Sequence, residues 1–141
     1  MLPLRYARRW RVAGAVLLAF VLATTVMPAV WLWPDRLSSM SWLENADKLA
    51  HFATFALLTL WFAGQYRPRS YWRIAVGLLA FGILIEVCQR AVGYRSAEWL
   101  DFGADAVGII VGLAIAVAGA GGWCQPFEAW YIGRRSGAGI D

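Results

Sequence analysis

The sequence predicts an all-α integral membrane protein, a four-helix bundle that crosses the bilayer with both the N- and the C-terminus in the cytoplasm. Of its 141 residues, 60% are hydrophobic and only 16% are charged, whereas soluble domains average about 45–50% and about 25%. The apolar residues fall in four blocks, each near the roughly 20 residues that a helix needs to cross a membrane. Basic residues gather beside alternate ends of these blocks, as cytoplasmic loops do.

The four apolar blocks are expected to be helices, because backbone groups in lipid must bond within their own segment. Their approximate bounds are 11–33, 49–66, 74–92 and 102–123. The first block is interpreted as a retained span rather than a signal peptide, since no small-residue cleavage site follows it. The remaining segment, 124–141, is expected to be a basic cytoplasmic tail, so that residues 1–141 form a single transmembrane domain.

The distribution of charge predicts the orientation. Most basic residues lie before the first block, between the second and third, or after the fourth: Arg5, Arg8, Arg9, Arg11, Arg67, Arg69, Arg73, Arg134 and Arg135. Most acidic residues lie at the other ends: Asp35, Glu44, Asp47, Glu86, Glu98, Asp101 and Asp105. The positive-inside rule therefore places both termini in the cytoplasm. Orientation accounts for the net charge of +4, and no nucleic-acid partner is expected.

Polar residues gather at the outer ends of the second, third and fourth helices, because successive helices alternate in direction. The set comprises Asp47, Lys48 and His51, then Glu86, Gln89 and Arg90, and then Arg95, Glu98, Asp101 and Asp105. Glu86 shares one helix face with Gln89 and Arg90 at i+3 and i+4. An ionisable residue at such a depth is costly unless it is paired or lies in a wet cavity. We therefore expect one extracytoplasmic site.

The residue types suggest roles in this site. The candidate catalytic residues are His51, Glu86, Asp101 and Asp105, with His51 as the general acid or base near neutral pH. The candidates for binding a head group are Asp47, Lys48, Gln89, Arg90 and Arg95. Glu86, Asp101 and Asp105 are also candidate ligands for Mg²⁺ or Ca²⁺, which prefer oxygen. Each residue alone has an ordinary explanation, such as Asp101 capping the fourth helix.

Asp101, Asp105, Gly108 and Gly112 form one stripe along the fourth helix. The glycines are expected to let a neighbouring helix approach closely. The carboxylates at the top of the stripe should then face the bundle rather than lipid.

Three ordered motifs are present: Asp47 to Phe52 as D-K-x-x-H-F, Glu86 to Gln89 as E-x-x-Q, and Arg95 followed by Asp101, Asp105 and Gly108. In these motifs the chain resembles the VanZ-like family of small bacterial membrane proteins, over about residues 45 to 115. Asp105 departs from the family pattern, in which Asn is expected more often. The resemblance implies a multi-pass protein of the bacterial cytoplasmic (inner) membrane. The family's namesake is associated with low-level teicoplanin resistance, an antibiotic-resistance link that does not transfer safely to every relative.

Three functions fit these observations. In the first, the site binds or processes an envelope lipid or a lipid-linked glycan in the outer leaflet, so that membrane lipids are its partners. In the second, the chain is a small proton-coupled transporter or channel, which requires oligomerisation because four short helices leave little room for a pathway. In the third, the chain is a non-catalytic scaffold whose polar cluster is a structural latch.

Overall fold

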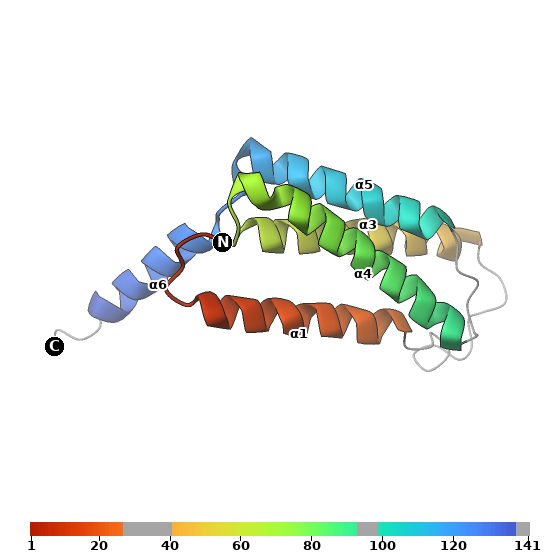
Figure 1. Cartoon of the computed structure of the whole chain (residues 1–141), viewed down its shortest axis with the longest axis horizontal. Coiled ribbons are helices and arrows are strands. Elements are labelled where there is room, and N and C mark those ends of the chain that lie inside the picture. Colours follow the sequence, from red (N-terminus) through yellow and green to blue (C-terminus); the bar gives the residue numbers. More distant parts are fainter. Residues whose placement is uncertain (27–40, 93–98, 138–141) are drawn as a thin grey trace.

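The computed structural model describes residues 1–26, 41–92 and 99–137, and only the backbone at 41–47, 92, 99 and 135–137. The regular structure of these residues is helical, as expected. The helices are α1 (Ala7–Val26), α3 (Ser41–Ala63), η1 (Pro68–Ser70), α4 (Tyr71–Val92), α5 (Trp99–Ile115), η2 (Ala116–Ala120) and α6 (Cys124–Gly137). Helices α1, α3, α4 and α5 lie alongside one another, and α6 extends past them at the end where the N-terminus lies (Figure 1).

Several bounds differ from those expected. α1 begins at Ala7 instead of residue 11, and the rest of the expected first span lies outside the described residues. α3 begins at Ser41 and ends at Ala63, so it is shifted toward the N-terminus of the chain. The segment expected as a tail is helical from Cys124 to Gly137. Its aromatic residues explain this difference, because Phe127 and Tyr131 pack against Trp10 and Tyr6 at the start of the chain.

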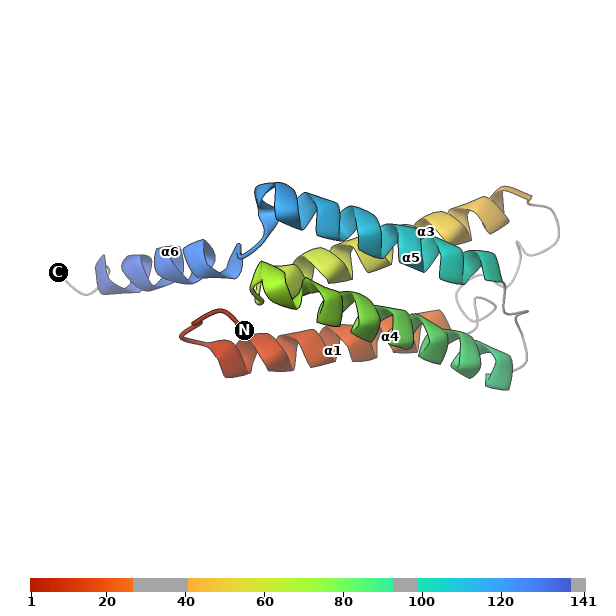
Figure 2. The ribbon, with the colours of Figure 1, turned by 45° about the horizontal axis from the view of Figure 1, so that its top comes forward.

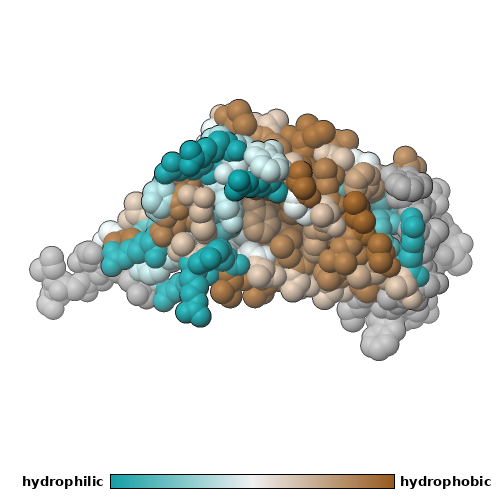
Figure 3. Space-filling view, in the orientation of Figure 1, coloured by the Kyte–Doolittle hydropathy of each residue, from teal (hydrophilic) through white to brown (hydrophobic). Residues whose placement is uncertain are grey.

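Three helical stretches are long and apolar enough to cross a membrane: Ala7–Val26, Pro68–Ala91 and Leu100–Ala120. The described apolar part of α3, Lys48–Ala63, is shorter. Hydrophobic residues cover the middle of the visible face, and hydrophilic residues gather at the end nearest α6 (Figure 3). This distribution is typical of a helical membrane protein.

The closest helix packing joins α3 to α5, as the glycine stripe predicts. A Cβ atom added to Gly108 would collide with the carbonyl oxygen of Phe52, and one added to Gly112 would lie 2.7 Å from that of Ala56. Glycine is therefore needed at both positions for the two backbones to meet. The core beside this contact contains fully buried apolar side chains, among them Phe55, Leu58, Ile85 and Ile109.

α1 is packed less closely than the other long helices, and its buried residues are Gly14 and Val21. It lies beside α4 in both views (Figure 1, Figure 2). Glu128 of α6 holds its first turn, accepting hydrogen bonds from the backbone N–H groups of Arg5 at 2.8 Å and Tyr6 at 3.0 Å. The indole of Trp10 donates a third bond of 2.8 Å to the same carboxylate. A carboxylate at this position also complements the positive end of the helix dipole.

Glycines turn the chain from α5 into α6. η2 continues α5 as a π-helical segment in which Gly119 has φ 131°, and Gly122 follows with φ 72°. Both values lie in the region that glycine adopts without a steric penalty. The fourth span consequently ends near Ala120 rather than at residue 123.

Candidate functional site

Five of the polar residues singled out in the sequence are buried at the end of the bundle opposite α6. They come from three helices: α3 supplies His51, α4 supplies Glu86 and Gln89, and α5 supplies Asp101 and Asp105. The most exposed of them, Glu86, keeps only 9% of its surface accessible. The alternation of helix direction therefore brings together residues that are far apart in the chain.

His51 and Asp105 form the centre of the cluster. Nδ1 of His51 lies 2.9 Å from Oδ1 of Asp105, and both side chains are buried. With Asp105 ionised, Nδ1 carries the proton and donates it to the carboxylate, which leaves Nε2 as the basic nitrogen. An imidazole oriented in this way by a buried carboxylate is the arrangement that general acid–base catalysis uses.

Glu86 and Asp101 bring unpartnered carboxylate oxygens to the same cluster. Both oxygens of Glu86 and Oδ1 of Asp101 are buried, and no hydrogen-bond donor reaches them from the residues that the structure describes. Glu86 interacts electrostatically with Asp101, His51 and Asp105, so the four groups lie within one region. Buried oxygens of this kind are costly, because they have lost water without gaining a donor.

Gly82, which the motifs do not include, also shapes the site. A Cβ atom at this position would lie 2.7 Å from Oδ2 of Asp105. The glycine therefore leaves room for the carboxylate that orients His51. Its position one helical turn before Glu86 is the sequence signal that identifies it, since residues at i and i+4 share a face.

Gln89 binds the first helix in addition to lying in the cluster. Its Nε2 donates a hydrogen bond of 3.1 Å to the carbonyl oxygen of Thr25, in the last turn of α1. The sequence identified Gln89 as a candidate for head-group binding, but this amide nitrogen is already engaged by the protein. Thr25 contributes only a backbone atom, so no side-chain pattern could have identified it.

The basic residues lie at the edge of the cluster. Arg90 is exposed, and Lys48 is half-buried. Arg90 also interacts electrostatically with Glu86. The side chain of Asp47 and the whole of Arg95 lie outside the described residues. The described part of the site thus has an acidic interior beside a basic rim.

The Mg²⁺ or Ca²⁺ site at Glu86, Asp101 and Asp105 stays a prediction. Among the described residues, no group of three or more His, Cys, Asp or Glu side chains is arranged to hold a metal ion. The unpartnered oxygens of Glu86 and Asp101 can accept hydrogen bonds from donors such as hydroxyl or ammonium groups.

The fold and this cluster define a small helical membrane protein with a buried polar site at one end of its bundle. The chain belongs to the VanZ/LLP1 family, whose model matches residues 10–120. This match confirms the resemblance found in the sequence, and it includes every residue of the cluster while leaving α6 outside. Comparisons with curated proteins and with solved structures gave no match.

Proposed function

We propose that the protein binds or processes an envelope lipid or a lipid-linked glycan at the outer face of the bacterial inner membrane. The observation that carries the proposal is the buried His51–Asp105 pair beside Glu86 and Asp101. Both carboxylate oxygens of Glu86 and Oδ1 of Asp101 are buried without a donor among the described residues. In this proposal the donors come from the ligand. Sugar hydroxyls and the ammonium group of a phospholipid both fit this requirement.

The proposal gives the chain four membrane crossings and cytoplasmic termini, so that the site lies on the outer side. The first turns of α3 carry the polar residues Glu44, Asn45 and Asp47, but the helix lies against both α4 and α5. A helix that is covered by others can cross with polar residues facing the bundle. The arginines near the start of α1 and around η1 share the end of the bundle opposite the cluster, which supports a cytoplasmic location for that end.

The acidic interior and the basic rim of the site can bind different parts of one lipid head group. Glu86 and Asp101 accept hydrogen bonds from its hydroxyl or ammonium donors. Arg90 and Lys48 lie where they can bind its phosphate through charge-assisted hydrogen bonds. Nε2 of His51 then takes a proton from a bound hydroxyl or returns it, while Asp105 keeps the ring oriented.

The latch hypothesis is favoured by one observation, because the His51–Asp105 contact joins α3 to α5. It does not account for Glu86 and Asp101, since a latch gains nothing from buried oxygens without donors. The transporter hypothesis needs polar groups along the whole bundle. Below the cluster, the described core is mostly apolar and includes Phe55, Leu58 and Ile109. Thr59 and Gln65 are also buried, and each donates a hydrogen bond to the backbone carbonyl oxygen four residues before it.

Head-group binding tests the proposal. The purified protein is titrated with phosphatidylethanolamine, whose ammonium is a donor, and with phosphatidylcholine, which has no N–H group. A polyprenyl-pyrophosphate-linked disaccharide is the third probe, and native mass spectrometry measures the fraction bound. We expect wild type to prefer phosphatidylethanolamine or the disaccharide lipid, and Glu86→Gln and Asp101→Asn to lose this preference.

Gly103→Ala is the matched control for these variants, because Gly103 is on α5 and a Cβ there meets nothing within 4 Å. The melting temperature of each variant is measured in parallel. Intact binding with a large loss of stability in Glu86→Gln and Asp101→Asn would favour the latch. Equal binding of all three probes by wild type would contradict the proposal.

A further inference from the structure

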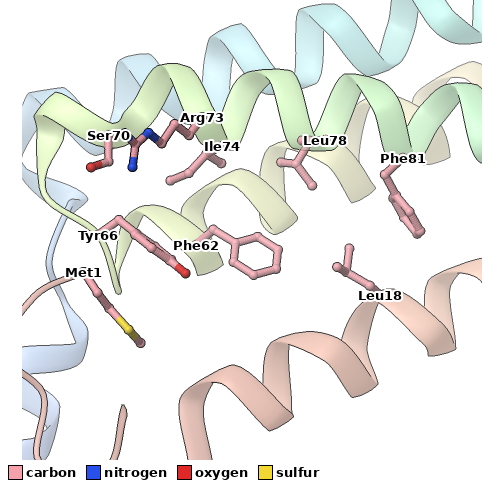
Figure 4. Close-up of a pocket in the computed structure, with 10 residues that line it drawn as sticks. Met1, Leu18, Phe62, Tyr66, Ser70, Arg73, Ile74, Leu78 and Phe81 are labelled. Atoms are coloured by element: carbon pink, nitrogen blue, oxygen red, sulfur yellow. The ribbon is translucent and has the colours of Figure 1, made fainter. Parts of the chain in front are cut away.

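A cleft lies toward the end of the bundle opposite the polar cluster. It is a half-open cleft of about 390 Å³ between α1, α3 and α4. Leu18, Phe62, Ile74, Leu78 and Phe81 form its apolar walls (Figure 4). Ligand pockets are commonly about 300–1,000 Å³ and mostly apolar, with few polar groups. The cleft has these properties and shares no residue with the polar cluster.

Polar groups line only one part of this cleft. Ser70, Arg73 and the hydroxyl-bearing ring of Tyr66 lie at the end of the cleft near Met1 (Figure 4). Arg73 is exposed, stacks over Trp72 with 5.3 Å between its guanidinium carbon and the ring centroid, and pairs with no carboxylate of the described residues. A guanidinium with this freedom can bind a phosphate through two N–H groups.

The apolar part of the cleft is empty space rather than a tight helix contact. Gly77 lines it on α4, and a Cβ atom added there would meet nothing within 4 Å. Gly82, five residues further along α4, shows the contrast, since its Cβ would lie 2.7 Å from Oδ2 of Asp105. The cleft can therefore receive a chain of methylene groups without displacing a side chain.

The charge of Arg73 distinguishes this cleft from a second apolar cleft of the same molecule. Another cleft of about 440 Å³ lies between α1 and α3 and is lined by residues such as Leu17, Leu57 and Trp61. It is larger, but no charged side chain lines it. Any lipid tail can occupy such a surface, whereas the cleft at Arg73 joins an apolar channel to a cation.

We infer that the cleft at Arg73 is a binding site for an anionic phospholipid, with its phosphate at Arg73 and an acyl chain along Gly77 toward Phe81. This lipid would belong to the inner leaflet, because the topology proposed above puts this end of the bundle at the cytoplasmic face. The binding itself does not depend on the outer site.

Two variants test the site, one for each part of the ligand. Arg73→Gln removes the charge, and Gly77→Leu fills the apolar channel. The matched controls are Arg69→Gln, an arginine that does not line the cleft, and Gly103→Leu, a glycine of α5 with nothing within 4 Å. Native mass spectrometry of the detergent-purified full chain measures binding of phosphatidylglycerol and of phosphatidylcholine, alongside each melting temperature.

We expect wild type to bind phosphatidylglycerol more tightly than phosphatidylcholine. Arg73→Gln should weaken phosphatidylglycerol binding about tenfold, since a hydrogen bond to a charged group is lost. Gly77→Leu should weaken both lipids, and the two controls should behave as wild type. Equal binding by Arg73→Gln and Arg69→Gln would overturn the inference.

Photo-crosslinking gives a second readout that does not depend on variants. Phosphatidylglycerol with a diazirine in its acyl chain should label the peptides that contain Leu18 and Gly77 to Phe81. Labelling at Leu57 and Trp61 instead would also overturn the inference, because the lipid would then occupy the uncharged cleft. Glu86→Gln, which tests the outer site, should leave this labelling unchanged and so separates the two proposals.

Discussion

At the level of single residues, His51 and Glu86 differ in whether their buried side chains have a hydrogen-bond partner. His51 has a buried partner in Asp105, at 2.9 Å. Glu86 has two buried oxygens without a donor among the described residues. A binding site that is complementary to its ligand often leaves such groups unsatisfied until the ligand arrives, at a cost in stability.

This contrast predicts stability changes of opposite sign. Glu86→Gln removes a buried carboxylate without a donor, so the melting temperature should stay the same or rise. His51→Ala leaves the Asp105 carboxylate buried without its partner and should destabilise the protein by about 3–5 kcal/mol. Thermal unfolding in one detergent measures both. A lower melting temperature for Glu86→Gln would mean that its carboxylate has a structural partner.

A second residue-level prediction concerns the space around Asp105. Gly82→Ala brings a methyl group to 2.7 Å from Oδ2 of Asp105, which should displace this carboxylate and disturb its hydrogen bond with His51. We expect loss of head-group preference with a modest destabilisation of about 1–3 kcal/mol. Gly77→Ala on the same helix, where a Cβ meets nothing within 4 Å, is the matched control. Identical behaviour of the two variants would contradict the role given to Gly82.

Among the helices, the contact between α6 and α1 is the longest-range connection of the fold. Glu128 accepts three hydrogen bonds from residues at the start of the chain. Around it, Trp10 packs against Trp61 and Trp123 with ring centroids 5.5 Å apart in each pair. The family match ends before α6, so this attachment lies outside the shared part of the chain.

Removing the Glu128 carboxylate should therefore loosen the start of α1. Glu128→Ala should destabilise the first turns by about 1–3 kcal/mol, because backbone N–H groups lose a charged acceptor. Hydrogen exchange should become faster for the peptide that covers residues 2–10, while peptides of α3 and α5 stay protected. Unchanged protection of residues 2–10 would show that the aromatic contacts alone hold α1.

The same carboxylate affects Cys124, which is free and fully buried. Burial, with a contribution from Glu128, raises the pKa of the Cys124 thiol from 9.0 to about 12. The thiolate is the reactive form, so iodoacetamide should modify Cys124 very slowly at pH 8 in a Cys88→Ala background. Modification should become faster as pH rises toward 12, and faster at pH 8 in Glu128→Gln. Rapid modification of the folded protein at pH 8 would contradict the buried position of this thiol.

For the molecule as a whole, topology is the first property to measure. Green fluorescent protein fused after the last residue should fluoresce, because we place the C-terminus in the cytoplasm. Alkaline phosphatase inserted between residues 93 and 98 should be active, because that segment is proposed to lie outside. The opposite pattern would place the polar cluster on the cytoplasmic side and would exclude an outer-leaflet substrate.

The sequence predicted the convergence of His51, Glu86, Asp101 and Asp105, since alternating helices must bring these positions to one end. It also predicted from Gly108 and Gly112 that a neighbouring helix comes close to α5, and the structure identifies this helix as α3. The role of Glu128 could not be predicted, because nothing local indicates a partner more than a hundred residues away. The cleft at Arg73 depends on how loosely α1 packs, which is a tertiary property that hydropathy does not report.

The attachment of Glu128 to the start of α1 also has a consequence for biosynthesis. The backbone N–H of Arg5 and its acceptor are 123 residues apart, so the first helix leaves the ribosome long before its cap exists. During translation, α1 has to remain in the insertion machinery or the bilayer with its first turn incomplete, until the last helix is made. Chains terminated before residue 128 should accordingly be recognised by membrane quality-control proteases, even though they contain every residue of the polar cluster.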